Sequence, residues 1–515
     1  MKCTVGLDFG TQSARGVLVN VENGAVMRRM TVEYAHALTD DALVDGADYD
    51  RALDELLMWL VPGNDVAGIA IDATALTLVP IAADGRLLSE HMPDAMHARV
   101  KLWKRHDAQP QADRALELAR EYGEAFLDNT GGAISSEWTI PKLMETCEKA
   151  SDVWENMDMA LDLCDYLTWR LTGEVTRSAA SMCYKSCWTA ENGFPSEEYL
   201  DALEPGFGKR YRYLMRGRVM YPGQKAGTLT AQWREKLGAT GDIAVAAGQP
   251  DGNTPPVAMG AVNDGDVSLT IGTSMVMLAN TSHLDGKDGL IGTAPGGIVP
   301  DLTAAECGQN CTGELLGWYV ENMLPAAYAA EAERRGISPH DLLAEKVTEP
   351  WNNRAVACNW WNGSRCAPAD LSLTGAVTGL TLASRPEDIY LTLVQSLAVN
   401  TREMLELCRA NGAHVERIFA AGGVAGKNAL FMQQIADITG MAVHVTLTEE
   451  ASALGSAYLA AVATGIYESP EAACSAMCGE GFRVYEPDGA HRAEYEELYT
   501  RCRQVRKAMA KAPFR

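Results

Sequence analysis

Two segments of the chain share one alternation of apolar and polar residues. Short apolar runs at residues 5–9 and 14–20 flank a Gly-Thr-Gln-Ser tip, and the pattern predicts a β-hairpin. Residues 265–280 repeat it, with a Gly-Thr-Ser tip at residues 272–274. Two hairpins of one design predict a duplicated α/β core.

The remaining apolar pattern predicts further strands and helices. Strands are expected at residues 66–72 and 416–420, because both runs are short and apolar. Residues 109–172 follow a helical pattern with few Gly or Pro. The uncharged stretch 451–467 is rich in Gly, Ala and Ser and is too short to span a bilayer. We expect it to form a helix of small residues packed against a sheet.

The length of 515 residues suits two large domains or about three smaller ones. Pro and Gly crowd residues 247–256, as is typical of a connection between domains. We therefore predict one domain over residues 1–256 and a second over residues 257–515.

The composition limits the classes of partner. Hydrophobic residues make up 47% of the chain and charged residues 22%, which excludes wholesale disorder. Lys plus Arg number 44 against 68 Asp plus Glu, so the net charge is −24. Such an acidic chain lacks the basic surface that would attract nucleic acid or an anionic membrane. Binding an anion such as a nucleotide would require backbone N–H groups, a divalent cation and a few placed cations.

The N-terminus and the cysteines indicate a cytoplasmic protein. Asp8 falls where the apolar part of a signal peptide would continue, so we expect no such peptide. The thirteen cysteines contain no C-x-x-C pair, and no C-x3-C pair has a His at zinc spacing. Buried, reduced thiols are therefore expected.

The two hairpin tips are candidate phosphate sites. Backbone N–H groups and hydroxyls at Thr11, Gln12 and Ser13 could cradle phosphate oxygens, as could those at Gly272 and Thr273. Asp8, which ends the first strand, is suited to hold Mg²⁺ through water. One such loop alone is more typical of an ordinary hairpin, and the pair is the stronger signal.

A third glycine turn follows the strand predicted at residues 416–420. Gly422 and Gly423 precede a helical run, and such a turn lets an adenine and ribose lie against the backbone. A tight strand-to-helix turn without a ligand is the alternative. The chain has neither a G-x-G-x-x-G after an early strand nor a P-loop motif, so dehydrogenase and P-loop folds are unsupported.

Asp251 is the candidate base. It lies in the polar, glycine-rich segment 248–254, and a carboxylate there could accept the proton of a hydroxyl that attacks a γ-phosphate. The alternative is a turn aspartate in Pro-Asp-Gly.

These motifs occur in the order typical of one family. The order is Asp8-Phe-Gly-Thr-Gln-Ser13, the Asp251 segment, Ile271-Gly-Thr-Ser274 and Ala421-Gly-Gly-Val424. Nearly the whole chain thus resembles the FGGY carbohydrate kinases, which are ATP-dependent sugar kinases of the actin-like fold.

Within the family the chain most resembles the L-ribulokinase branch. The segments that carry this likeness are Asp72-Ala-Thr-Ala-Leu-Thr77, Leu102-Trp-Lys104, Tyr184-Lys-Ser-Cys-Trp188, Glu306-Cys-Gly-Gln309 and Trp361-Asn-Gly-Ser-Arg365. Cys183 and Tyr184 stand where the branch has Gly-His.

The resemblance implies a role for each candidate residue. Asp251 would be the base, and the sugar pocket would also contain Ala75, Lys185 and Glu306. Phosphate would be held by Thr11, Gly272 and Thr273, and adenosine by Gly422, Gly423 and Asn428. Taken alone, a lysine such as Lys185 is more typical of a solvated surface.

The resemblance also implies a fold and a reaction. The fold would be two RNase H-like α/β domains with an interdomain catalytic cleft, with sugar bound mainly by the first domain and ATP by the second. With ATP and Mg²⁺, the protein would phosphorylate the terminal hydroxyl of a ketopentose, L-ribulose above all. The resemblance is also compatible with a homodimer. D-Ribulokinase and xylulokinase activities are the near alternatives, and a non-catalytic actin-like ATPase scaffold is the distant one.

Overall fold

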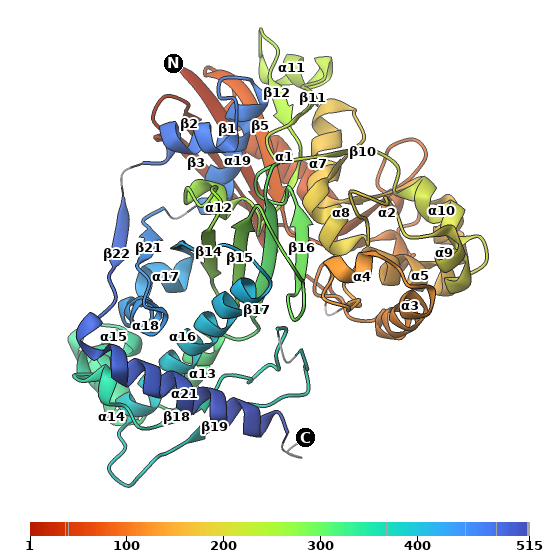
Figure 1. Cartoon of the computed structure of the whole chain (residues 1–515). Helices are drawn as coiled ribbons and strands as arrows, with labels where there is room; N and C mark the ends of the chain where they lie inside the picture. The colour runs from red at the N-terminus through yellow and green to blue at the C-terminus, as the bar shows by residue number, and fades with distance from the viewer. Residues whose placement is uncertain (37, 40, 367–368, 449, 480, 512–515) are drawn as a thin grey trace. The chain divides into compact units, whose positions relative to one another are not determined.

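A computed structural model describes residues 1–36, 38–39, 41–366, 369–448, 450–479 and 481–511 (Figure 1). The chain divides into two compact units. The first comprises Met1–Val262, Gly292–Ala304 and Glu450–Gly479, and the second comprises the rest of the chain. The division predicted between residues 256 and 257, with sugar on one side and ATP on the other, stays a prediction.

The first unit is built on a mixed sheet in which strands follow the order β11-β12-β5-β1-β2-β3, with β13 also paired to β5. The strands are β1 (Lys2–Phe9), β2 (Ser13–Asn20), β3 (Val26–Glu33), β5 (Asp65–Ala73), β11 (Lys225–Thr228), β12 (Ala244–Ala246) and β13 (Gln249–Pro250). β1 runs antiparallel to β2 and parallel to β5. The predicted hairpin and the strand expected at 66–72 are confirmed.

Helices pack on both faces of this sheet. Gly6 faces α19 (Ala451–Ala463) so closely that a Cβ atom on Gly6 would lie 1.8 Å from the carbonyl oxygen of Ala453. The neighbouring residue Leu7 points to the opposite face, where its cross-strand partner Gly16 contacts Leu56 of α1 (Ala47–Leu60). The expected helix of small residues against a sheet is confirmed, since only small side chains permit this approach.

The region predicted to be helical contains one strand. Its helices are α3 (Gln109–Tyr122), α4 (Phe126–Asn129), α5 (Thr139–Lys149), α6 (Ser151–Asn156) and α7 (Leu163–Thr172). Between α6 and α7 lies β8 (Met159–Asp162), which pairs with β6 (Leu78–Ile81). The helical prediction was wrong there, because four residues are too few for a period to show and the pairing partner is distant in sequence.

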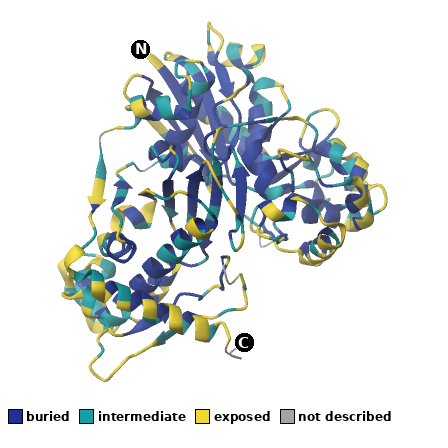
Figure 2. Cartoon of the chain, in the orientation of Figure 1, coloured by how far each residue is buried: buried dark blue, intermediate teal, exposed yellow. Residues whose placement is uncertain are grey.

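Helices α3 and α5 share a core with α9 (Glu197–Leu203) and α10 (Phe207–Leu214). Figure 2 shows these helices buried on their inner sides and exposed on their outer sides, whereas the strands of the first sheet are buried along most of their length. The polar groups enclosed within this region therefore need partners inside the protein.

The second unit repeats the arrangement of the first. Its strands follow the order β17-β15-β14-β20-β21-β22. They are β14 (Asp266–Ile271), β15 (Met275–Thr281), β17 (Thr303–Gln309), β20 (Arg417–Ala421), β21 (Val443–Thr446) and β22 (Phe482–Tyr485). β14 is antiparallel to β15 and parallel to β20, as β1 is to β2 and β5. The duplicated core predicted from the two hairpins is confirmed.

The thirteen cysteines all carry free thiols, and all except Cys147 and Cys478 are buried. Burial of the thiols is confirmed for eleven of the thirteen, and their reduced state stays a prediction. Among the described residues, no helix combines the length and the apolar character needed to cross a bilayer.

Candidate functional site

Three carboxylates meet at one edge of the first unit's sheet. Asp8 of β1 pairs with Asp72 of the parallel strand β5, so both lie at the carboxyl ends of their strands. Gln249 of β13 also pairs with Asp72, which brings Asp251 to the same edge. The backbone N–H of Asp251 donates to the carbonyl of Ala73 at 2.8 Å. In open α/β sheets, ligands bind outside the carboxyl ends of the strands.

Burial and mutual repulsion raise the pKa values of these carboxyl groups. Asp72 is fully buried, and its pKa lies well above the usual range because of burial first and the charge of Asp8 second. The pKa of Asp8 is raised by burial, although Arg15, whose guanidinium lies 3.4 Å away, opposes the shift. Burial and the charge of Asp8 raise the pKa of Asp251 to about 7. Asp251 can therefore take up and release a proton near neutral pH.

The side chains of Asp72 and Asp8 interact with each other. Their interaction lowers the pKa of Asp8 and raises that of Asp72, while burial raises both. Oδ2 of Asp72 accepts from the hydroxyl of Ser456 at 2.7 Å.

Ala75 lies beside Asp251. Its backbone N–H donates to the Asp251 carboxylate and opposes the rise of that pKa, as does the N–H of Gly252. Ala75 is partly exposed, and the next residue, Leu76, adopts a left-handed conformation with φ of 62°. Such a conformation is strained for leucine, and strain of this kind clusters at functional sites.

Lys185 ends α8 (Ala179–Lys185) and is partly buried. Its Nζ lies 5.4 Å from the ring centroid of Tyr184 and 5.9 Å from that of Trp138. The hydroxyl of Tyr184 donates to the carbonyl of Ala304 at 2.9 Å, which fixes the ring. The ammonium group thus lies against two aromatic rings rather than on a fully solvated face.

The first hairpin tip is closed by a bond from the N–H of Gly10 to the carbonyl of Ser13 at 3.0 Å. Gln12 is exposed and Thr11 is partly exposed, whereas Ser13 is buried at the start of β2. The hydroxyl of Thr11 accepts from the indole N–H of Trp103 at 3.3 Å. Contacts of Thr11, Gln12 and Ser13 with phosphate stay predictions.

The two glycine turns of the second unit lie side by side. Thr270 pairs with Ala421, so Gly272 and Gly422 follow the ends of neighbouring parallel strands. Gly422 has φ of 104°, and a Cβ atom there would lie 2.4 Å from the carbonyl oxygen of Ile271. Only glycine fits this position. A sheet edge with exposed backbone suits a flat ligand or a chain of phosphates.

The exposed residues of these turns are Gly272, Thr273, Gly422 and Gly423. The N–H of Gly272 donates to the carbonyl of Ser274, and the carbonyl of Thr273 accepts from the N–H of Thr312 at 2.8 Å, just before α13 (Gly313–Met323). The second tip is thereby fixed to the start of a helix.

Asn428 and Glu306 lie elsewhere in the second unit. The Asn428 side chain caps α18 (Ala429–Thr439) by accepting from the N–H of Phe431, and it donates to the hydroxyl of Tyr390. Glu306 is partly exposed on β17 between buried Ala305 and Cys307. Binding of adenosine by Asn428 and of sugar by Glu306 stays a prediction.

Sequence reasoning missed Asp72 as a member of the carboxylate cluster and Ser456 as its hydrogen-bond partner. A signal for Asp72 exists, because it ends an apolar run as Asp8 does, and parallel neighbours bring such ends together. Ser456 carries no comparable signal within an Ala- and Gly-rich helix.

The cluster is compatible with Mg²⁺ held mainly through water. Among the described residues, no three His, Cys, Asp or Glu side chains are arranged to hold a metal ion together. Mg²⁺ commonly uses one or two carboxylates and keeps several waters, so Asp8, which ends β1 beside Asp72, fits this mode.

The N-terminal domain model of the FGGY family of carbohydrate kinases matches residues 3–255, and the C-terminal domain model matches residues 267–464. A ribulokinase of Shouchella clausii is 34% identical, over 96% of this chain and 93% of the relative. A ribulokinase of Mycolicibacterium smegmatis is 33% identical, over 97% and 92%.

Solved structures give the same fold. The xylulose kinase from Rhodospirillum rubrum superposes with a TM-score of 0.83 at 20% identity, with 99% of each chain covered. The gluconate kinase from Lactobacillus acidophilus gives 0.82 at 19% identity, again with 99% of each chain covered. The chain therefore belongs to the FGGY family of carbohydrate kinases and is a sugar kinase with the actin-like ATPase fold.

Proposed function

We propose that this chain transfers the γ-phosphoryl group of ATP to the terminal hydroxyl of a ketopentose, and that L-ribulose, giving L-ribulose 5-phosphate, is the substrate. Membership of the family implies a sugar and ATP as substrates. The relatives named ribulokinase support a ketopentose. The observation that carries the proposal is the Asp251 carboxylate, fixed by the Ala75 N–H and with a pKa of about 7.

Asp251 acts as the base. Its carboxylate accepts the proton of the sugar hydroxyl while that oxygen forms a bond to the γ-phosphorus and the bond to the β-phosphate oxygen breaks. ADP leaves with the electron pair of the broken bond, and Asp251 later returns its proton to solvent. A pKa near the working pH suits both halves of this cycle.

The sugar is bound by Ala75, Lys185 and Glu306 in addition to Asp251. The Lys185 ammonium donates to the keto oxygen or to a hydroxyl, and the Glu306 carboxylate accepts from hydroxyls. Tyr184, which packs beside Lys185, stands where the L-ribulokinase branch has His and is the first position to vary if the ketose preference differs.

The nucleotide is bound by the glycine turns. Thr11, Gln12, Ser13, Gly272 and Thr273 face the phosphates, and Gly422, Gly423 and Asn428 face adenosine. Asp8 would hold Mg²⁺ through water, and the ion would offset the charge of the phosphates. The free thiols support a reducing, cytoplasmic compartment. A homodimer is compatible with the resemblance. Sedimentation of the purified protein measures the oligomeric state.

A coupled assay of ADP release tests the proposal. L-Ribulose, D-ribulose, D- and L-xylulose, glycerol and gluconate are compared at equal concentrations, and L-ribulose is expected to give the highest kcat/KM. A preference for D-ribulose or xylulose would correct the substrate. Slow ATP hydrolysis unaffected by every sugar would instead favour an ATPase scaffold.

Variants test whether Lys185 and Glu306 bind the sugar rather than ATP. Lys185→Met and Glu306→Gln are expected to raise the KM for the sugar about tenfold or more, since each removes a charged hydrogen bond, with little change in the KM for ATP. Lys209→Met, at an exposed position of α10, is the control. Equal effects on both substrates would contradict the assignment.

A further inference from the structure

Lys142 of α5 is a buried lysine that donates to two backbone carbonyls. Its side chain is enclosed, with 1% of the residue exposed. The Nζ atom lies 2.7 Å from the carbonyl oxygen of Leu76 and 2.9 Å from that of Leu102. Burial lowers the pKa of Lys142 to about 7. Burying an amine is costly, so these two bonds have a specific structural role.

The first carbonyl belongs to the strained residue next to Ala75. Leu76 has φ of 62°, a conformation that is strained for leucine. The same short segment presents the Ala75 N–H to the carboxylate of Asp251. Lys142 therefore bonds to the residue that directly follows the donor of this contact.

The second carbonyl precedes Trp103, whose indole N–H donates to the hydroxyl of Thr11. One amine therefore fixes two segments, one leading to the base and one leading to the first hairpin tip.

The start of α5 also contacts the segment that carries Lys185. The ring of Trp138, which precedes the helix, lies 5.9 Å from the Lys185 ammonium. The hydroxyls of Thr139 and Ser186 lie 3.0 Å apart. The first turn of α5 is thus a common support for the residues assigned to the sugar.

We infer that Lys142 is a positioning residue of the kinase, which clamps the Leu76 and Leu102 carbonyls and thereby aims the Ala75 N–H at Asp251. The inference rests on the proposed function, because it assigns Asp251 the role of base. Lys142 itself does not need to touch either substrate.

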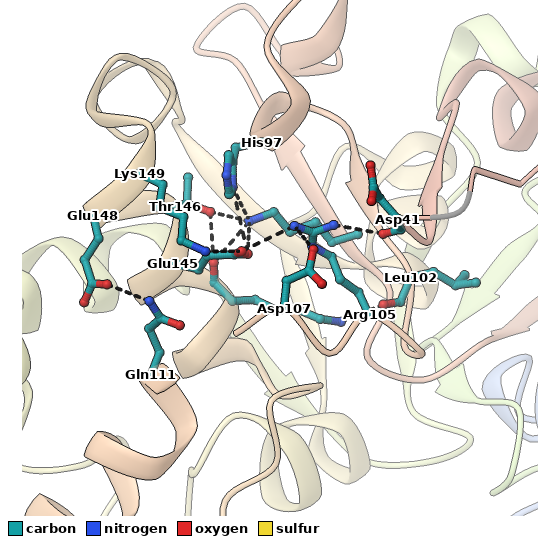
Figure 3. A network of polar contacts seen from close by, with 12 residues as sticks. Asp41, His97, Leu102, Arg105, Asp107, Gln111, Glu145, Thr146, Glu148 and Lys149 are labelled. Carbon is teal, nitrogen blue, oxygen red and sulfur yellow. Dashed lines mark hydrogen bonds and ion pairs between the residues drawn. The ribbon is translucent and has the colours of Figure 1, made fainter. Parts of the chain in front are cut away.

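A second buried lysine nearby provides a matched control. Lys101 is also 1% exposed, and burial lowers its pKa to about 7. Its Nζ donates to the carbonyl of Lys142 and to the hydroxyl of Thr146, and it also contacts the His97 ring and lies 3.7 Å from the Glu145 carboxylate. Figure 3 shows His97, Thr146 and Glu145 in this network, in which Arg105 also bonds to Glu145. Lys101 thus matches Lys142 in burial but does not donate to Leu76.

The test compares Lys142→Met with Lys101→Met in the full chain. With the preferred ketopentose, K142M is expected to lower kcat/KM about 30- to 100-fold, since small displacements of a base are costly. Loss of the Ala75 N–H bond should also move the acid limb of the pH profile upward by about 0.5–1 pH unit. K101M should lower thermal stability similarly while leaving the pH profile in place.

A second substitution addresses the strain directly. In Lys142→Met/Leu76→Gly, glycine adopts the left-handed conformation without cost, so the double variant should recover at least a third of the lost activity and the original pH profile. It also serves if K142M alone does not fold. An unshifted profile in K142M, or a double variant no better than K142M, overturns the inference.

These measurements distinguish a failure of the proposed function from a failure of the role assigned to Lys142. If the wild-type chain phosphorylates no ketopentose, the proposed function fails before any variant is compared. If it does and K142M behaves as K101M does, the proposed function stands and the positioning role of Lys142 is wrong.

Discussion

The hydroxyl of Ser456 donates a 2.7 Å hydrogen bond to Asp72, although 384 positions separate the two residues. Asp72 in turn pairs with Asp8 on the neighbouring strand. A serine on α19 therefore orients one buried carboxyl group, and this group lies beside a second one at the edge of the sheet. In this relay the bond from Ser456 favours the charged form of Asp72 and so offsets part of the cost of burying two carboxyl groups side by side.

Ser456→Ala is expected to lower the midpoint of thermal unfolding by a few degrees, because a buried hydrogen bond contributes about 1 kcal/mol. Turnover should fall about threefold to tenfold, since Asp72 loses the partner that fixes its orientation. Both are measured on the same preparation, by differential scanning fluorimetry and by ADP release.

Ser396→Ala provides the control for Ser456→Ala. Ser396 is equally buried, at 1% exposure, but its hydroxyl donates to the Leu393 carbonyl of its own helix. This variant should leave turnover within twofold of the wild type. An equal loss of turnover in both variants would contradict a relay through Asp72.

The activity should depend on pH through Asp251. Because the base acts in its deprotonated form and its pKa is about 7, kcat/KM for the sugar should rise about tenfold per unit below pH 7 and level off above it. Asp251→Asn should lower kcat about 10²- to 10⁴-fold and should leave the Kd for ATP nearly unchanged. Activity that is flat from pH 5.5 to 8 would contradict the assignment.

The same group should make the protein less stable as the pH rises. The pKa of Asp251 is raised from 3.8 to about 7 on folding, so its stabilising contribution is present below about pH 4 and is lost as the pH rises through 7. Asp251→Asn should therefore unfold at a higher temperature than the wild type at pH 8, and the difference should vanish near pH 4. A lower unfolding temperature at pH 8 would contradict the cause assigned to the shift.

Local patterns explain which features the sequence predicted. The hairpins around Gly10 and Gly272, the turn at Gly422 and the strand before Asp72 each depend on a few neighbouring residues, and the structure has all four. The family resemblance added the order of these motifs along the chain, and that order led to the fold and to the candidate base.

Features that depend on distant partners did not show in the sequence. β8 is four residues long and forms because β6 lies beside it. Lys142 looks like a residue of the solvated face of a helix, since a lysine is rarely buried, and only the carbonyls of Leu76 and Leu102 reveal its role. Long-range polar pairs of this kind leave no period in the sequence.

Substitutions in the turn at Gly422 and Gly423 should distinguish a role in nucleotide binding from a role in packing. A Cβ atom on Gly423 would meet no protein atom within 4 Å, so Gly423→Ala should keep its stability and raise the KM for ATP about tenfold if adenosine lies there. Gly422→Ala should instead unfold at a lower temperature, because its Cβ atom would meet the carbonyl of Ile271. Gly426→Ala is the control, because a Cβ atom on Gly426 would also meet no protein atom within 4 Å. An unchanged KM for ATP in Gly423→Ala would show that the turn does not belong to the ATP site.

Removal of divalent cations should abolish turnover, and Mg²⁺ should restore it, because the phosphates of ATP need a counter-charge that this acidic chain does not supply. Asp8→Asn should raise the Mg²⁺ concentration for half-maximal activity about tenfold, since it removes the carboxylate assigned to the ion. Asp65→Asn changes an exposed carboxylate at the opposite end of β5 and is the matched control. Calorimetric titration of Mg²⁺ in the presence of ADP measures the binding apart from turnover. If Asp8→Asn and Asp65→Asn bind Mg²⁺ equally well, Asp8 does not hold the ion, and the charge of Asp8 serves only to raise the pKa of Asp251.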